Sequence, residues 1–346
     1  MKKKSIVKII SVLLSVALVF VITVGGYFVF RLNCDKSGAA HSYEEVYAKG
    51  GVYVHLDNSG LFKVLKINDT HLLNGVCDND VKTLKSIKTV LNQTTCDLII
   101  VNGDLVDGFN LSLDYNKYQA IDKFAELIED YDIPWTFAPG NNDSEMDGDN
   151  EDVIAYMMKY THFIYGNDQG VDGSMQLFID LLYNQKLVYS VAVLDSNSRK
   201  IRVIGSYDYI KQSQIDWLVK GVNERNVKTS VFCHIPTPQF KEAYENGKAY
   251  EGYQMFNNND YADISENALF DNAVNDIDNI TLISCSHQHG NNMCSFYNGR
   301  YYQLSSPSGY NAGRPEEIVP SCTLTTINVN SENVESMYEF EQIYFE

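Results

Sequence analysis

The chain has 346 residues and a hydrophobic fraction of 45%, which excludes an intrinsically disordered protein and is enough for a large globular domain with a packed core. Its formal net charge is −18, and five of its cations precede the first acidic residue, Asp35, so the rest of the chain is more acidic still. Such a surface repels a nucleic-acid backbone, and we expect no nucleic-acid partner.

The first predicted element is a membrane-spanning helix. Residues 9–30 carry no charge, and at about 1.5 Å per residue they cover roughly 33 Å, which matches a hydrocarbon core of about 30 Å. Lysines at positions 2–4 precede this run, so the positive-inside rule places the N-terminus in the cytoplasm. We therefore expect residues 1–31 to form a cytoplasmic tip and a transmembrane signal-anchor, residues 32–58 a stalk, and residues 59–346 an extracytoplasmic domain. A cleaved signal peptide is the alternative.

After residue 59, short apolar runs alternate with amphipathic helical patterns. Three continuous apolar runs predict strands, namely Phe62–Ile67, Leu98–Val101 and Trp135–Ala138. Between them, apolar residues recur at helical spacing, first at Val81, Leu84, Ile87 and Val90, and then at Ile121, Phe124, Ala125 and Ile128. This β-α-β-α-β order predicts an α/β domain with a largely parallel sheet.

The second half of the chain continues the same pattern. Its predicted strands are Leu187–Leu194, Arg202–Gly205, Val231–Cys233, Ile280–Ser284 and Thr323–Val329. One helix is predicted where Ile215, Leu218, Val219 and Val222 share a face. Residues 295–303 predict a β-hairpin, because Asn298-Gly299 is a favoured two-residue turn.

The seven cysteines contain no Cys-x-x-Cys pair, so we expect no cysteine-only zinc site. Disulfides form outside the cytoplasm, but the spacing of these cysteines does not assign them to pairs. Cys233 and Cys285 end apolar runs and fit the pattern of small buried residues.

Residues that bind metals cluster directly after five of the predicted strands. They stand in the segments Asp69-Thr70-His71, Gly103-Asp104-Leu105-Val106-Asp107, Gly140-Asn141-Asn142-Asp143, His234 and His287-Gln288-His289. In α/β sheets, sites form where the carboxyl ends of strands meet. Ligands two residues apart on extended backbone turn to one side of it, and carboxylates with imidazoles suit Zn, Mn or Fe. A single carboxylate can also bridge two ions, and such pairs clamp phosphoryl oxygens.

Each of these residues also has an ordinary structural interpretation. A histidine taken alone is more often a packed or surface residue than a ligand, and Asn102, Asp107 and Asp143 could cap turns or support the ligands. Four of the seven histidines, however, lie at strand ends within these segments. This coincidence favours a shared metal site over separate structural roles.

In order and spacing, these segments resemble the motifs of the calcineurin-like metallophosphoesterase family over residues 60–315. Trp135, residues 207–217 and His234-Ile235-Pro236 are most similar to its purple-acid-phosphatase-related subgroup. The resemblance implies a four-layer α/β/β/α sandwich that hydrolyses a small phosphate ester by means of a hydroxide between two metal ions. These ions would be divalent or of mixed valence, of the Mn, Zn or Fe type. One would be held by Asp69, His71, Asp104 and His289, and the other by Asp104, Asn141, His234 and His287, with Asp104 as the bridge.

Asn142 and Ser286 depart from the family pattern, which has glycine in place of Ser286, and Asp107 departs from the pattern of its purple phosphatases alone. Asp107 stands where purple phosphatases carry an iron-ligating tyrosine, so a ferric purple centre is not expected. Asn142 stands where the family has a histidine that assists the leaving group, and an amide donates a hydrogen bond but no proton near neutral pH. We therefore expect Asp104 and Asn142 to act in catalysis, with slow turnover. The alternative is a catalytically weakened, surface-displayed binding protein that keeps the fold.

Overall fold

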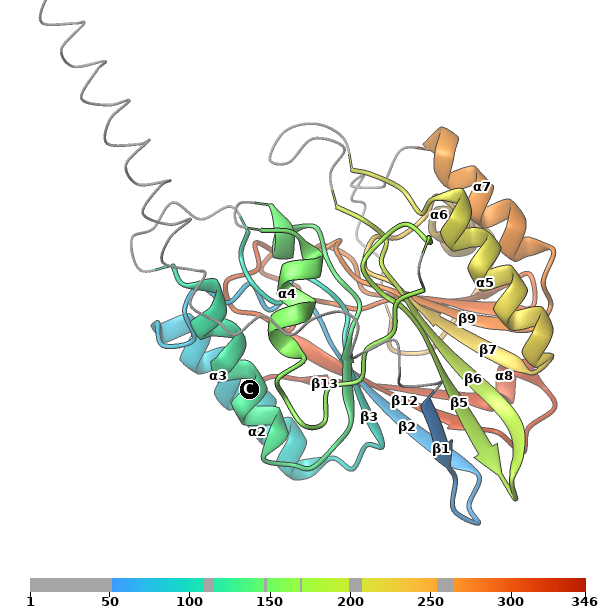
Figure 1. The fold of residues 1–346 in the computed structure, drawn as a ribbon, viewed down its shortest axis with the longest axis horizontal. Helices are drawn as coiled ribbons and strands as arrows, with labels where there is room; N and C mark the ends of the chain where they lie inside the picture. Colours follow the sequence, from blue (N-terminus) through green and yellow to red (C-terminus); the bar gives the residue numbers. More distant parts are fainter. Residues whose placement is uncertain (1–51, 109–114, 146–147, 169, 199–206, 254–263) are drawn as a thin grey trace, which may run out of the picture. The chain divides into compact units, whose positions relative to one another are not determined.

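The computed structural model describes residues 52–108, 115–145, 148–168, 170–198, 207–253 and 264–346 (Figure 1). The predicted membrane-spanning segment, residues 9–30, and the predicted strand Arg202–Gly205 lie outside these residues. Within the described part of the chain, no helix combines the length and the apolar character needed to cross a bilayer.

The smaller of two sheets contains the strands predicted in the first half of the chain. Its five strands stand in the order β13 (Tyr338–Tyr344), β12 (Ser321–Asn328), β2 (Leu61–Ile67), β3 (Leu98–Val101) and β4 (Trp135–Phe137). β2, β3 and β4 are parallel neighbours, as the alternating order of strands and helices predicts. β12 pairs antiparallel with β2, and β13 pairs antiparallel with β12.

The larger sheet has eight strands. Their order is β1 (Val52–His55), β5 (Gln176–Tyr183), β6 (Lys186–Leu194), β7 (Lys228–Phe232), β9 (Ile280–Cys285), β11 (Arg300–Leu304), β10 (Met293–Tyr297) and β8 (Lys248–Ala249). β6, β7, β9 and β11 are parallel neighbours and form its centre. The predicted hairpin is confirmed, because β10 and β11 are antiparallel and turn at Asn298-Gly299, where φ is +48° and +80°.

The expected stalk, residues 32–58, overlaps the first strand of the larger sheet. β1 pairs with β5 over the whole range Val52–His55. Val52 and Val54 are half-buried and pack against the main hydrophobic core. Residues 52–55 are therefore part of the sheet, because apolar burial and strand pairing both hold them there.

Alternating side chains of the larger sheet face two different hydrophobic clusters. Ile179, Val191 and Val193 belong to the cluster that contains the smaller sheet, whereas Ala192 and Leu194 belong to a second cluster. Because successive side chains of a strand point to opposite faces, the larger sheet is buried on both sides.

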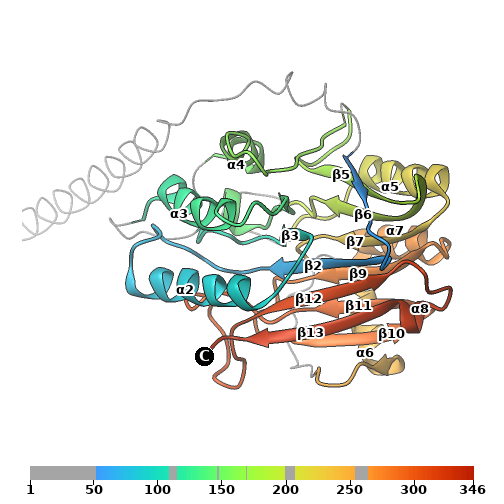
Figure 2. The same ribbon diagram turned by 90° about the horizontal axis from the view of Figure 1, so that it is seen from below.

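Helices cover the two outer sides of the paired sheets (Figures 1 and 2). α5 (Gln212–Arg225), α6 (Gln239–Asn246) and α7 (Ile264–Asn275) contribute to the second cluster, outside the larger sheet. α2 (Asp78–Gln93), α3 (Lys117–Glu129) and α4 (Asn150–Met157) pack with the smaller sheet. Two short helices, η2 (Asn142–Ser144) and α8 (Val334–Met337), complete the described elements. The arrangement is the predicted α/β/β/α one.

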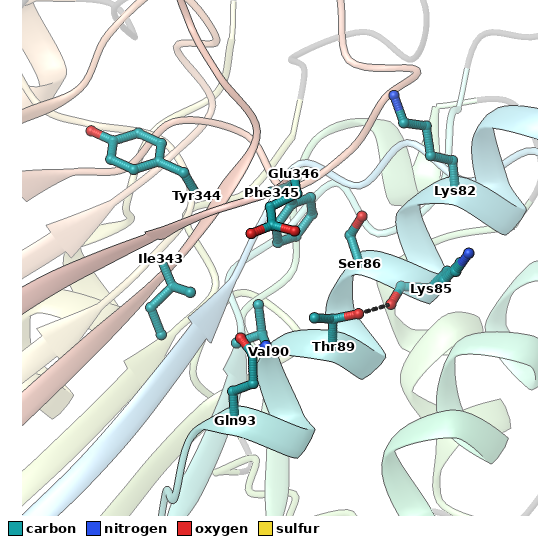
Figure 3. A pocket seen from close by; sticks show the side chains of 10 residues that line it. All are labelled: Lys82, Lys85, Ser86, Thr89, Val90, Gln93, Ile343, Tyr344, Phe345 and Glu346. Carbon is teal, nitrogen blue, oxygen red and sulfur yellow. Dashed lines mark hydrogen bonds between the residues drawn. The ribbon is translucent and has the colours of Figure 1, made fainter.

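A cavity of about 320 Å³ lies between α2 and the end of β13 (Figure 3). Its described lining includes Lys82 and Lys85 from α2, Tyr344 at the end of β13 and Glu346 beyond it. None of the predicted metal ligands is part of this described lining. The candidate site therefore lies elsewhere, at the carboxyl ends of the central strands.

Candidate metal centre

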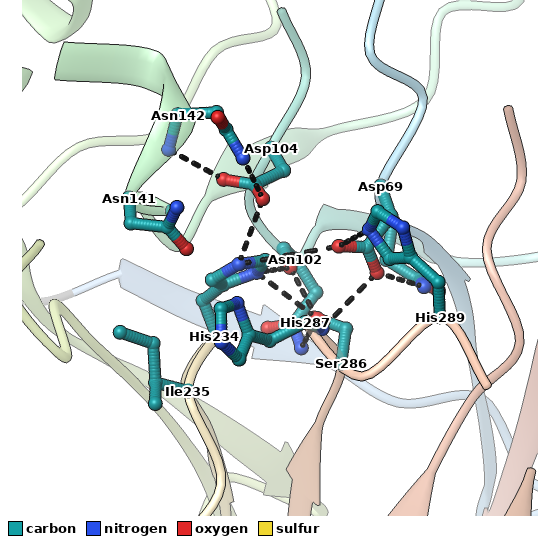
Figure 4. A network of polar contacts seen from close by, with 12 residues as sticks. Asp69, Asn102, Asp104, Asn141, Asn142, His234, Ile235, Ser286, His287 and His289 are labelled. Atoms are coloured by element: carbon teal, nitrogen blue, oxygen red, sulfur yellow. Dashed lines mark hydrogen bonds and ion pairs between the residues drawn. The ribbon is translucent and has the colours of Figure 1, made fainter. Parts of the chain in front are cut away.

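The loops that follow β2, β3, β4, β7 and β9 meet at one place (Figure 4). They carry all seven predicted ligands: Asp69, His71, Asp104, Asn141, His234, His287 and His289. His71 and His289 are 218 positions apart in the chain, yet their Nε2 atoms lie 3.0 Å from one another. Parallel strands that end at the same edge bring these loops together.

Six of the seven residues form two overlapping groups of candidate ligand atoms. The first group is Asp69, His71, Asp104 and His289, and the second is Asp104, His234 and His287. Within each group the ligand atoms lie within 4.8 Å of one another. Asp104 belongs to both groups, with its Oδ2 atom 3.6 Å from His71 Nε2 and 3.3 Å from His234 Nε2.

Asn141 lies beside the second group. Figure 4 shows its amide facing Asp104 and His234. Asn141 Nδ2 donates to Glu145 Oε1 at 3.1 Å, which fixes the orientation of the amide and leaves Oδ1 for the centre. The structure thus places Asn141 next to the second group, and its role as a fourth ligand there stays a prediction.

The backbone at this centre is strained at four of the candidate ligands. Asp69, His71, Asp104 and His287 all have positive φ, at 48°, 45°, 50° and 71°. L-residues seldom adopt this conformation, and it persists where surrounding contacts enforce it, most often at functional sites. Here Asp69 N donates to Gly103 O at 2.9 Å and His71 N donates to Asp104 O at 3.1 Å, so the first two loops hold one another.

Gly103 permits the close approach of the β3 loop to the β7 loop. Its φ is +83°, and a Cβ atom at this position would collide with the ring of His234. Only glycine combines that backbone angle with that lack of bulk. The Gly-Asp sequence therefore places Asp104 against the His234 imidazole.

Backbone carbonyls orient two of the imidazoles. His234 Nδ1 pairs with Asn102 O at 2.9 Å, and His289 Nδ1 pairs with Gly313 O at 2.8 Å. In each ring the Nε2 atom remains for the centre. Second partners of this kind set the tautomer and the direction of metal-binding histidines.

At this centre Asp104 and His287 are in the ionisation state that a bound cation needs, whereas His234 carries a proton. Burial alone would raise the pKa of Asp104, but the facing imidazoles, chiefly that of His234, lower it well below its usual value. Burial and the neighbouring His234 lower the pKa of His287 to about 3, so its ring is neutral. Burial would also lower the pKa of His234, but Asp104 and Asp69 raise it to about 10, so a cation that binds here displaces a proton.

Several buried polar atoms at the centre have no partner. Among the described residues, none donates to Asn141 Oδ1 or pairs with either ring nitrogen of His287, although all three atoms are buried. An unpaired buried polar group costs about 1–3 kcal/mol. A cation bound between these residues would satisfy such atoms, so the residues present fit the pair of metal ions that the sequence predicts.

Asn142 binds the carboxylate that the two groups share. Its backbone N donates to Asp104 Oδ1 at 2.8 Å, and its side-chain Nδ2 donates to Asp104 Oδ2 at 2.6 Å. The half-buried amide therefore lies at the edge of the centre and donates to Asp104, and its role in catalysis stays a prediction.

Of the three residues predicted as possible supports, Asn102 and Asp143 hold the loops from within. Asp143 accepts hydrogen bonds from the backbone N of Asp104, Gly140 and Val106. Asn102 Nδ2 donates to Cys233 O and Ser286 Oγ, both at 3.0 Å. Asp107 is half-buried, and its backbone N donates to Leu72 O at 3.1 Å.

A loop that no motif indicates also supports the first group. Asn311 Nδ2 donates to His71 O at 2.9 Å and to Asp80 Oδ1 at 2.6 Å. Asp80 Oδ2 in turn accepts from the backbone N of Leu73, Asn74 and Gly75. Asn311 and Gly313 thus contact both histidines of the first group, and no local sequence pattern could have identified them.

We expect Asn311→Ala to weaken metal binding at the first group by about 10–100-fold, since the loss of an outer partner typically has this effect. Binding at the second group should change much less, because Asn311 contacts none of its residues in the described structure. Competition with a chelator measures both affinities. Asn246→Ala, at an exposed position on α6, is the control. An equal loss at both groups would contradict this local role.

Asp271, which accepts hydrogen bonds from the turn after His234, should make the stability of the folded chain depend on pH. Thr237 Oγ1 and Gln239 N donate to Asp271, and burial raises the pKa of this carboxyl to about 6 from 3.8. Between these pH values the folded chain keeps a proton that the unfolded chain has lost. The contribution of Asp271 to the free energy of unfolding is therefore full below pH 4 and is lost as the pH rises through about 6, by about 3 kcal/mol in all.

Asp271→Asn should remove this part of the pH dependence. Urea unfolding of the wild type and the variant between pH 4 and 7 gives the free energy of unfolding of each. The difference between the two free energies should change with pH. Asp276→Asn, at an exposed position just beyond α7, should follow the wild type. Parallel pH profiles of wild type and Asp271→Asn would refute the assignment.

Comparison with known proteins places the fold and the motifs in a family. The sequence pattern of the calcineurin-like phosphoesterase family matches residues 62–291, which is more than half of the chain. Among solved structures, a dimetal phosphatase from Danio rerio superposes with a TM-score of 0.53 at 10% identity, over 82% of this chain and 99% of that one. At so low an identity the likeness is one of fold, and it supports the predicted metallophosphoesterase architecture.

Two curated relatives are similar in sequence. A protein named "Probable inactive purple acid phosphatase 14" from Arabidopsis thaliana is 25% identical over 234 residues, which is 54% of this chain and 56% of the relative. "Protein SIA1" from Kluyveromyces lactis is 24% identical over 264 residues, which is 71% of this chain and 42% of the relative. The chain thus spans about half the length of these relatives. Together with the family match, they show that the chain belongs to the calcineurin-like phosphoesterase family and has homologues of the purple-acid-phosphatase type.

Proposed function

We propose that the chain hydrolyses small phosphate esters with two metal ions held at its strand ends. The observation that carries this proposal is that two groups of candidate ligands share one carboxylate, Asp104. A shared carboxylate lets two cations lie close together, as two-metal phosphoester hydrolysis requires. Membership of the family supports the reaction class.

Each ion is assigned four residues in this proposal. The first would be held by Asp69, His71, Asp104 and His289, and the second by Asp104, Asn141, His234 and His287. This mixture of imidazole, carboxylate and amide suits Mn, Zn or Fe, divalent or of mixed valence, whereas Mg and Ca prefer oxygen ligands alone. When bound, such a pair polarises phosphoryl oxygens and lowers the pKa of the attacking water.

In this proposal, residue 142 decides which leaving groups of the ester are favoured. Asn142 stands where the family pattern has a histidine that assists the leaving group, and its amide, which donates to Asp104 Oδ2 in this structure, has no proton to transfer near neutral pH. Leaving groups that depart without protonation, such as nitrophenolate, should therefore be the better substrates. Both mono- and diesters meet this condition.

Release of nitrophenol from aryl phosphate mono- and diesters tests the proposal. The full-length chain in detergent is loaded with Mn, Zn or Fe, its metal content is determined by elemental analysis, and release is followed with and without a chelator. We expect metal-dependent release. A folded chain that holds two ions and releases no nitrophenol with any of these metals would overturn the proposal.

We further propose that the domain acts on the outer side of a membrane, anchored by residues 1–31. The support is the uncharged run 9–30 and the lysines that precede it. Protease added to intact cells that express the chain should digest the domain. Full protection, with digestion only after lysis, would place the domain inside.

A second candidate function is a surface-displayed binding protein that keeps the fold and has lost most of its activity. Asn142 favours this alternative, and one similar protein is itself named as probably inactive. The effect of restoring a histidine at position 142 separates the two candidates.

A further inference from the structure

Two buried cysteines lie side by side directly before ligands of the second group. Cys233 follows β7 and precedes His234, and Cys285 is the last residue of β9, two positions before His287. Their Sγ atoms are 3.4 Å apart, and both residues are fully buried. The two thiols are therefore in contact with one another and shielded from solvent.

The two cysteines are aligned across neighbouring parallel strands. Val231 pairs with Ile283 and Phe232 with Ser284, so the next positions along both strands are Cys233 and Cys285. Cys233 N donates to Ser284 O at 3.2 Å, which continues the ladder to this point. Paired residues of neighbouring strands lie about 4.8 Å apart, inside the range of about 4.4–6.8 Å between Cα atoms that a disulfide spans.

Two buried side chains, Asn102 and Lys66, bind the backbone carbonyls of the two cysteines. Asn102 Nδ2 donates to Cys233 O at 3.0 Å, and Lys66 Nζ donates to Cys285 O at 2.9 Å. Lys66 Nζ also donates to Ser284 Oγ and Gln303 Oε1. The register of the two cysteines is thus fixed, with their Sγ atoms facing one another at 3.4 Å.

We infer that Cys233 and Cys285 form a disulfide bond when the chain folds in an oxidising compartment. The two thiols lose two protons and two electrons as the S–S bond forms. A small disulfide oxidant such as glutathione disulfide accepts them and becomes two thiols. The bond joins β7 and β9 at the point where they deliver His234 and His287, whose ring centroids are 5.1 Å apart. It therefore holds the two imidazoles of the second group in register, whether or not the centre hydrolyses phosphate esters.

Peptide mapping tests this inference. The full-length chain is unfolded with reductant and refolded in detergent with glutathione and glutathione disulfide. It is then treated with N-ethylmaleimide in denaturant and digested. Because the folded domain buries both sulfurs, the refolding step gives the oxidant access to them. We expect a peptide pair joined through Cys233 and Cys285, which separates on reduction and is absent after refolding in glutathione alone.

Cys233→Ser and Cys294→Ala provide matched controls. In Cys233→Ser, Cys285 should take up N-ethylmaleimide in full, because it has lost its partner. Cys294 is equally buried but lies on β10, two strands away from β9, so its replacement should leave the joined peptide intact. If Cys233 and Cys285 both carry N-ethylmaleimide after oxidative refolding, in chain that has regained its metal ions, the inference is overturned. The same mapping is made without reductant on chain from cells in which added protease digests the domain, so that the domain lies outside the cytoplasm. Free thiols at both positions in that chain would also overturn the inference.

Discussion

Asp104→Ala is expected to lower the rate of phosphate-ester hydrolysis by at least about 10³-fold and to reduce the metal content from two ions to one or none. Asp104 belongs to both groups of candidate ligands, so its loss removes a ligand from each ion and the link between them. The loss of a single electrostatic contact in an active site already costs about 10²–10³ in rate. Elemental analysis and nitrophenol release measure the two effects on the same sample.

The control for this variant is Asp216→Asn, which changes an exposed carboxylate on α5 that accepts from Gln212. It should bind two ions and keep the wild-type rate. Circular dichroism and the unfolding midpoint show whether Asp104→Ala is folded. If the folded variant retains two ions and the wild-type rate, the shared carboxylate has no catalytic role and the proposed centre is wrong.

Asn142→His is expected to raise the rate on alkyl phosphates by about 10²–10⁴-fold, the usual contribution of a general acid. The backbone N of residue 142 would still donate to Asp104 Oδ1, while the imidazole replaces an amide that carries no transferable proton. Aryl phosphates should gain far less, because nitrophenolate leaves without protonation. The ratio of alkyl to aryl rates, measured across pH, isolates this effect from general changes in binding.

Asn142→Ala is the matched control, since it removes the amide and adds no acid. It should not raise the alkyl rate. A large gain in Asn142→His from a negligible wild-type rate would identify a chain that has lost its catalytic acid and favour the binding-protein alternative. If a strong wild-type rate stays unchanged in Asn142→His, residue 142 does not limit turnover, and our prediction of slow hydrolysis is wrong.

Elements with a continuous or strictly periodic apolar pattern could be predicted closely from the sequence. β3 occupies the predicted Leu98–Val101, and β2 extends the predicted strand by one residue at Leu61. In α2 the predicted face holds at Ile87 and Val90, which are buried. Val81 is 50% exposed, because the buried face passes through Asp80 and Thr83 at the start of the helix. Local periodicity carries this information because it reports which face of an element is covered.

β1, β5 and β13 could not be predicted in this way. In β5, the sequence from Gln176 to Tyr183 is buried along most of its length in spite of polar residues at Gln176 and Asp180. Asp180 is tolerated because Ser190 and Arg225 both donate to its Oδ1 atom. Partners 10 and 45 positions away along the chain decide the burial of this strand, and no local window contains both of them.

The sequence by itself determined the chemistry available at each strand end, because residue type and position after an apolar run are local properties. The resemblance implied that these ends meet and that Asp104 is shared, but only the tertiary structure decided how closely the side chains approach and that Asn311 and Gly313 support them. It also decided the positive φ of Asp69, His71, Asp104 and His287. The physical reason is that strained backbone and buried unpaired polar atoms persist only where contacts from distant parts of the chain enforce them.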